Sequence, residues 1–210
     1  QGDDYTKRFL YNVIKIRRKL MSKILLILIL SFSFQSWSKA DDIRDFQIEG
    51  MSVGDSLLNH FDITKIKGGL KDWYPDKNFS YSEFRDKKIK QFDKLGFFFK
   101  PADNNYKIYS ISGIKFCKKD IKICYDFQNE IETEFEKVSN VKPTKKTIKY
   151  PTSDDNGTGS FAKQSIYLFD NGDAVFIETK NWANDSKFHD NISLNADSKV
   201  FGDWLSSVSN

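Results

Sequence analysis

The sequence predicts an α+β fold: an antiparallel sheet of about four to five strands, built from two hairpins, with helices packed on one face. The expected order is α-α-β-β-α-β-β-(β)-α. Two pairs of strand-like segments are each separated by turn residues, Asp103-Asn104-Asn105 and Asn171-Gly172. A long segment with apolar residues at helical spacing lies between the pairs, and a shorter one closes the chain. Hairpins joined by helices favour this arrangement.

The elements before the first hairpin are two helices. The segment after Gly50 predicts a helix with Ser52 as N-cap and Asp55 completing a capping-box-like arrangement. Its apolar residues fall on one face: Val53, Leu57, Leu58 and Phe61. Residues 64–73 predict a second, short helix that ends before Pro75.

The first hairpin is expected from residues 92–100 and 106–116, and the strongest helix of the chain follows it. Asp120 is its expected N-cap. Its apolar stripe consists of Ile121, Cys124, Tyr125, Ile131, Phe135 and Val138. Its remaining surface is expected to hold Glu130, Glu132, Glu134 and Glu136.

The second half contains a connector, a hairpin and a closing helix. Residues 143–160 predict a polar connector, and residues 164–169 and 174–180 a hairpin around a type I′ turn. Residues 191–194 favour a further strand, and residues 198–208 a helix. Lysines 142, 145, 146 and 149 indicate a solvated linker; contact with anionic lipid or polysaccharide is the alternative.

The N-terminal region predicts export. A charged start at Met21, a run of seven aliphatic residues from Ile24 and small residues before the Ala40–Asp41 bond are typical of a cleaved signal peptide. The apolar stretch is shorter than the roughly 20 residues that a membrane-spanning helix needs. The expected organisation is therefore an upstream or non-native leader at 1–20, a signal peptide at 21–40 and one domain at 41–210.

The net charge of the expected mature domain differs from that of the whole chain. Residues 1–40 hold eight of the 33 lysines and arginines and two of the 29 acidic residues, which leaves 25 basic and 27 acidic residues. A nearly neutral domain does not support nucleic-acid binding. No cofactor motif is found. Cleavage of the signal would leave no stable transmembrane anchor, which predicts a periplasmic or secreted protein.

Cys117 and Cys124 are the two cysteines of the chain. In an exported protein such a pair favours a disulfide, with free thiols as the alternative. Metal binding would need further ligands, and the chain has only His60 and His189.

Two stretches carry a resemblance to a known group. They are Ser31–Leu58, and Tyr106–Ile114 followed by a cysteine-containing helix. They resemble a family of uncharacterised small exported proteins from marine alphaproteobacteria, which implies export and a helix-hairpin-helix-hairpin order but no activity. Gly50-Met51-Ser52 and the element order are also similar to small outer-membrane assembly and β-lactamase-inhibitor-like α+β proteins. The lipid-anchoring cysteine of the assembly proteins has no counterpart here.

Candidate site residues are few. His189 beside Asp190, with Trp182 nearby, could form a base oriented by a carboxylate, but a surface loop histidine is the simpler interpretation. Trp73 and Tyr74, with Phe79 and Tyr81, could form a platform for a sugar or peptide, or pack in the core.

These observations favour a non-enzymatic periplasmic binding or interaction module of unknown ligand. An envelope protein is one candidate partner. The alternatives are a periplasmic hydrolase using His189 and Asp190, and a structural envelope protein.

Overall fold

The computed structural model describes residues 42–74, 76–117, 120–150, 159–183 and 188–208. Backbone contacts divide the chain into residues 1–37 and 38–210, and every described residue belongs to the second unit. The expected leader, the signal peptide and the Ala40–Asp41 cleavage bond therefore lie outside the described residues.

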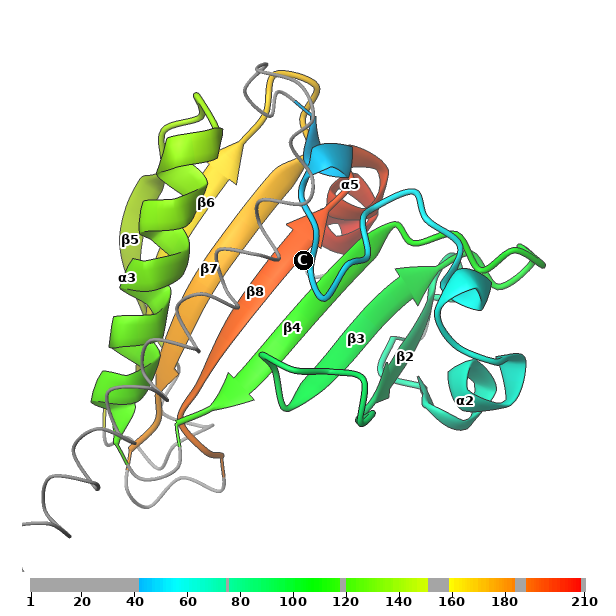
Figure 1. Cartoon of the computed structure of the whole chain (residues 1–210), viewed down its shortest axis with the longest axis horizontal. Coiled ribbons are helices and arrows are strands. Elements are labelled where there is room, and N and C mark those ends of the chain that lie inside the picture. The colour runs from blue at the N-terminus through cyan, green and yellow to red at the C-terminus, as the bar shows by residue number, and fades with distance from the viewer. Residues whose placement is uncertain (1–41, 75, 118–119, 151–158, 184–187, 209–210) are drawn as a thin grey trace, which may run out of the picture. The chain divides into compact units, whose positions relative to one another are not determined.

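The architecture is dominated by one antiparallel sheet (Figure 1). Within the described ranges it has eight strands in the order β1-β2-β3-β4-β8-β7-β6-β5. The strands are β1 Leu70–Lys71, β2 Ser80–Phe84, β3 Lys94–Phe99, β4 Ser110–Phe116, β5 Thr144–Lys149, β6 Phe161–Leu168, β7 Ala174–Asn181 and β8 Asn191–Asp197. Each half of the chain forms a four-stranded meander, and β4 pairs with β8 where the halves meet.

Helices lie on both faces of this sheet. The described helices are α2 Ile63–Gly68, α3 Ile121–Val138 and α5 Lys199–Val208, with 3-10 turns at Ile43–Asp45 and Leu57–Asn59. Figure 1 shows α3 in front of the strands and α5 behind them. We call these sides the α3 face and the α5 face.

The alternation of side chains along the strands explains why both faces are covered. One cross-strand row on the α3 face is entirely buried and consists of Tyr167, Val175, Ala196, Ile111 and Phe97. The Phe135 ring of α3 packs 4.2 Å from the Tyr167 ring, between centroids. Phe98, the next residue of β3, points the opposite way, and its ring lies 4.4 Å from that of Phe201 in α5. A second, smaller aromatic core therefore holds α5.

The expected fold class is wrong. The protein is mostly β, with eight strands rather than four or five and helices on two faces rather than one. The two expected hairpins are present as β3–β4 and β6–β7. Strands β1 and β2 were not expected, and β5 replaces part of the expected connector at 143–160.

The expected helix after Ser52 is also wrong. Ser52 N does donate to Asp55 Oδ2 over 2.8 Å, as a capping box would require. A helix cannot continue through Gly54, because this residue has φ +98°, outside the helical region. The segment forms a turn, and the 3-10 turn Leu57–Asn59 follows with Ser56 as its N-cap.

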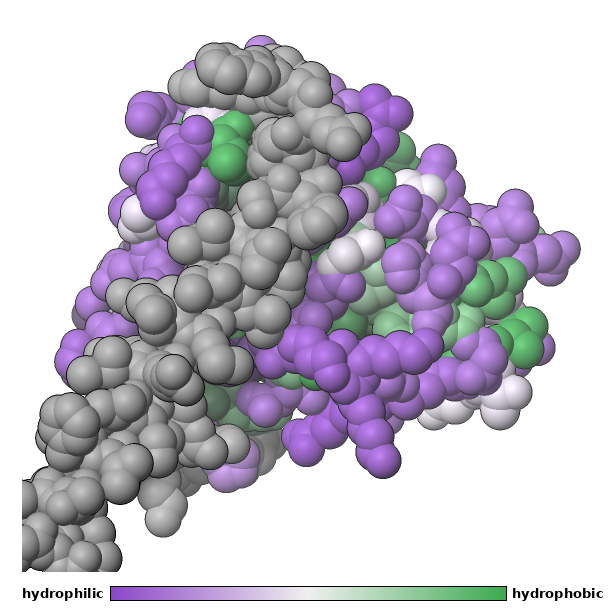
Figure 2. Space-filling view, in the orientation of Figure 1, coloured by the Kyte–Doolittle hydropathy of each residue, from purple (hydrophilic) through white to green (hydrophobic). Residues whose placement is uncertain are grey.

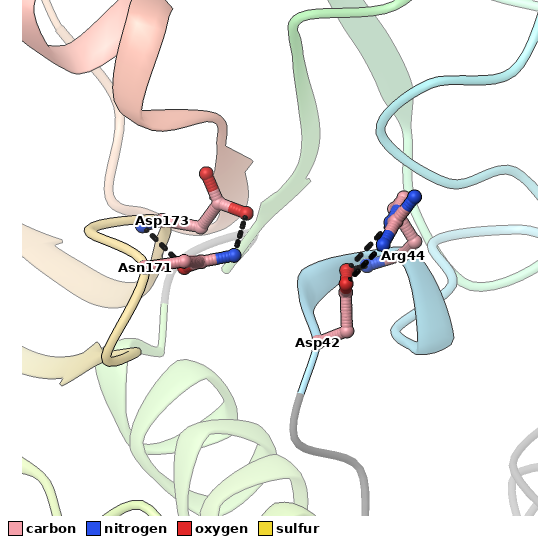
Figure 3. A network of polar contacts seen from close by, with 4 residues as sticks. All are labelled: Asp42, Arg44, Asn171 and Asp173. Carbon is pink, nitrogen blue, oxygen red and sulfur yellow. Dashed lines mark hydrogen bonds and ion pairs between the residues drawn. The ribbon is translucent and has the colours of Figure 1, made fainter.

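The turn between β6 and β7 differs from the expected type I′ turn. Gly172 has φ +86° and Asn171 does not have a positive φ, whereas type I′ requires both. Gly172 N donates to Phe169 O over 2.9 Å, which gives a three-residue loop. Figure 3 shows Asn171 bonded to Asp173, with the separate Asp42–Arg44 pair nearby. Asp173 Oδ1 also accepts from Lys199 N over 2.7 Å and so ties the turn to α5.

The surface of the α3 face differs between its two ends. In Figure 2 the α3 end is covered mainly by hydrophilic side chains, while hydrophobic surface shows around α2. Ile63 of α2 is 45% exposed. The α3 end of this face is therefore its polar end.

Candidate functional site

A polar groove lies between α3 and the β5–β6 pair, with a volume of about 400 Å³. We call it the α3–β5 groove. Every residue of its lining carries a polar side-chain group; the residues are Tyr125, Gln128, Asn129, Glu132, Lys145, Lys146, Thr147, Lys163, Gln164 and Ser165.

The two ends of α3 fix its position beside the groove. At its start, the Asp120 carboxylate accepts from Lys122 N over 2.9 Å, and Cys124 is bonded to Cys117 at the end of β4. At its other end, Phe135 packs on the sheet. The polar residues between these anchors are held against β5 and β6.

Glu132 is the central charged group of the groove wall. It is 7% exposed and accepts hydrogen bonds from Gln128 Nε2 (2.7 Å), Ser165 Oγ (2.7 Å) and Lys145 Nζ (2.5 Å). Burial acts to raise the pKa of this carboxyl, but the three donors outweigh burial, and the pKa is lowered. Glu132 is therefore a carboxylate whose charge is already balanced within the protein.

Lysines give the groove its positive character. Lys145 comes from β5 and Lys163 from β6, and both side chains lie on the α3 face. Lys146 also lines the groove, but it is the next residue of β5, so its side chain points to the opposite face of the sheet. Lys163 Nζ lies 4.3 Å from the centroid of the Tyr125 ring, a cation–π contact. Because Glu132 is the one acid of the lining, the groove carries a local excess of positive charge.

Two buried polar atoms of the groove residues have no hydrogen-bond partner among the described residues. They are Tyr125 OH and Gln128 Oε1. The orientation of the Gln128 amide is set by Glu132, because a carboxylate requires the NH₂ group opposite it. The Gln128 oxygen is then an unused acceptor on a side chain that is 7% exposed. Such atoms cost about 1–3 kcal/mol each when left unpaired.

The residues of the expected hydrolase pair have other surroundings. His189 is exposed, and its side chain has no hydrogen-bond partner in the part of the chain that the structure describes. Asp190 Oδ1 accepts from Trp182 N over 2.7 Å, and Asp190 O accepts from Cys117 N over 3.0 Å. These bonds tie strand ends together and do not orient the imidazole.

The expected aromatic platform is divided between surface and core. Trp73 is 58% exposed and stacks on Tyr81, with 4.5 Å between ring centroids. Tyr74 packs edge-on against Trp204 of α5 at 5.2 Å. Trp182 stacks on Tyr150 at 4.7 Å at the far end of the sheet. The three residues therefore do not share a site.

The expected disulfide is confirmed. Cys117 and Cys124 are bonded, with 5.6 Å between their Cα atoms, and both residues are fully buried. No group of three or more His, Cys, Asp or Glu side chains within the described ranges could hold a metal ion. In the same part of the chain, none of the helices is long and apolar enough to cross a bilayer.

A second hollow, of about 220 Å³, lies beside Glu49, His60 and Lys88. The carboxylate of Glu49 in this hollow already has protein partners, because it accepts from the backbone N–H groups of residues 90, 91 and 92. Lys88 Nζ donates to His60 O. These contacts anchor a loop, and the α3–β5 groove is the stronger candidate.

Sequence reasoning missed two key residues of the groove. It placed Glu132 with the solvent-facing glutamates and gave Gln128 no role, yet both are buried. A usable signal existed: Gln128 and Glu132 continue the helical spacing of Cys124, Ile131 and Phe135, so they are polar residues at core-facing positions. Polar residues at such positions need partners and often mark sites.

Comparison with protein-family models, curated proteins and solved structures found no match for this chain. The class of protein is therefore defined by its own geometry: a single antiparallel sheet with a lysine-rich groove under one helix.

Proposed function

We propose that this protein is an exported, non-enzymatic binding module whose α3–β5 groove takes a small negatively charged ligand. The observation that carries the proposal is the groove lining, where Lys145 balances the one carboxylate, Glu132, and Lys163 has no ion pair among the described residues. The groove also falls in the size range of small-molecule sites. The disulfide and the N-terminal export signal support a periplasmic or secreted location.

Ligand-dependent stabilisation tests this proposal. The unfolding midpoint of the full chain is measured by calorimetry with millimolar phosphate, citrate or glucuronate. We expect at least one of these anions to raise the midpoint, because a ligand that binds the native state stabilises it. The shift should shrink as salt screens the lysines.

A pair of double variants locates the effect. K145M/K163M removes two groove ammonium groups and should abolish the shift. K142M/K149M removes the same charge from exposed lysines outside the groove, and this variant should keep the ligand-induced shift of the midpoint. Equal shifts in both variants, or none in the wild type, would refute the proposal.

The location is tested separately. Mass spectrometry of the protein from fractionated cells should find a chain that begins at Asp41 in the envelope fraction. A cytosolic chain that retains residues 21–40 would contradict export.

A further inference from the structure

We infer that the groove recognises a hydroxylated anion, of the sugar-acid class, rather than a simple anion. This inference rests on the proposed function of the same groove. It follows from two atoms whose bonding is incomplete, Tyr125 OH and Gln128 Oε1.

The first step concerns charge. Glu132 receives three donors from within the protein, so it needs no cation from a ligand. Lys163 has no ion pair among the described residues, and its side chain lies on the groove side of β6, over Tyr125. A ligand carboxylate placed beside this ammonium group would gain a charge-assisted hydrogen bond.

The second step concerns the unused acceptor. Gln128 Oε1 can be satisfied only by a donor, because its amide nitrogen is held by Glu132. A carboxylate without a hydroxyl, like a fully ionised sulfate, has no hydrogen to donate. Gln128 Oε1 has almost no accessible surface in the free protein, so the Gln128 side chain must shift toward the groove to accept from a ligand hydroxyl. A ligand that carries both a carboxylate and a hydroxyl then satisfies both sides of the groove.

The third step concerns Tyr125. Its hydroxyl is buried without a partner, and its ring lies under Lys163 Nζ. We expect a bound carboxylate to draw the Lys163 ammonium group from the ring, and the Tyr125 hydroxyl to turn toward the same ligand and donate to it. The free protein therefore carries the cost of two unpaired atoms, and the ligand removes it.

Four probes separate charge from hydroxyl recognition: glucuronate, glucose, cyclohexanecarboxylate and inorganic sulfate. Their affinities for the full chain are measured by titration calorimetry at low salt. We expect glucuronate to bind about tenfold or more tighter than each of the others, since each of them lacks the charge or the combination of ring and hydroxyls.

Variants assign the effect to named atoms. Y125F should weaken glucuronate binding about fivefold, the equivalent of one hydrogen bond, while stability stays equal or rises because an unpaired hydroxyl is removed. K163M should weaken binding about tenfold. K149M, on β5 but outside the groove lining, is the matched control and should bind like the wild type.

The outcomes distinguish the two proposals. If cyclohexanecarboxylate or sulfate binds as tightly as glucuronate, or if Y125F binds normally, the hydroxyl inference fails and the anion site stands. If glucose binds as tightly as glucuronate, the groove does not recognise negative charge, and both proposals fail. Absence of binding by all four probes likewise overturns both.

Discussion

At the scale of single residues, the most unusual ionisable group is Asp197 at the end of β8. Its carboxylate accepts a hydrogen bond from Ser110 Oγ over 2.6 Å. Burial raises the pKa of Asp197 from 3.8 to about 7, although the Ser110 bond acts in the opposite direction. A raised pKa means that the folded protein prefers the protonated acid. The stability that this preference provides is complete below the unfolded pKa and is lost as pH rises through the folded pKa.

D197N should therefore change the pH dependence of stability. The free energy of unfolding of the wild type, relative to D197N, should fall between about pH 4 and pH 7, by at most about 4 kcal/mol. Denaturant titrations of both proteins across this range measure the difference. Asparagine keeps an acceptor for Ser110 and carries no charge at either pH. The free energy of unfolding of D197N, compared with that of the wild type, should therefore be higher at pH 7 than at pH 4. Parallel curves for the two proteins would show that Asp197 titrates normally.

Two glycines give a matched pair of opposite predictions. Gly172 has φ +86°, and a Cβ there would lie 2.8 Å from Lys199 Cδ. At Gly202, inside α5, a Cβ would meet no atom within 4 Å outside the helix's own backbone. We expect G172A to destabilise the protein by about 1–2 kcal/mol, because the left-handed conformation is strained for alanine. G202A should stabilise it by about 0.5–1 kcal/mol through helix propensity.

Urea denaturation of both glycine variants checks these signs. The pair is informative because the chemical change is identical and only the backbone conformation differs. A stabilising G172A would contradict the three-residue loop between β6 and β7.

At the scale of elements, the sequence was sufficient to predict a helix or strand wherever that element has its own periodic pattern of apolar residues. The helix over α3, the hairpins β3–β4 and β6–β7, and the closing helix α5 were all expected near their observed bounds. In each case apolar side chains recur with the period of the element, because that element buries a face. The site residues were predicted less well, because Glu132 was expected on the solvent-facing side of the helix and is in fact buried.

The missed strands lack such a signal for physical reasons. Strand β5 has the sequence Thr-Lys-Lys-Thr-Ile-Lys and is exposed along nearly its whole length, so only its pairing with β6 makes it a strand. Strand β2 alternates, but its fully buried Ser82 is polar and donates to Ile66 O over 2.7 Å. A lysine-rich edge strand also discourages pairing with other chains. Lys145 was named from the sequence, but neither Lys163 nor the strand that carries Lys145 was expected.

The disulfide links two elements, the end of β4 and the first turn of α3. Replacing both cysteines, as C117S/C124S, should lower the free energy of unfolding by about 2 kcal/mol, because the closed loop is short. Because α3 forms one wall of the groove, ligand affinity should fall as well. Chemical denaturation and calorimetry measure the two effects.

The wild type with and without reductant provides the control for this variant. Reduced wild type should match C117S/C124S in stability. If the double variant is as stable as the oxidised wild type, the bond does not constrain α3.

At the scale of the whole molecule, the decisive contact is between β4 and β8. These strands are separated in sequence by α3 and the first three strands of the second meander, and they pair over seven positions from Ser110–Asp197 to Phe116–Asn191. Sequence periodicity describes neighbours along the chain and carries no information on such a pairing. This is why two hairpins could be expected while the continuous eight-stranded sheet could not.

The position of β4 and β8 at the centre of the sheet predicts the order in which the native state opens. Amides of the β4–β8 pair should exchange with solvent only through global unfolding, because opening them separates the two meanders and exposes the core row through Ile111 and Ala196. Amides of edge strand β5 should exchange faster, through local opening. Hydrogen exchange followed by mass spectrometry at rising denaturant measures both. If β4–β8 amides exchanged before those of β6–β7, the meanders would be two independently stable units, and one cooperative sheet would be the wrong description of this protein.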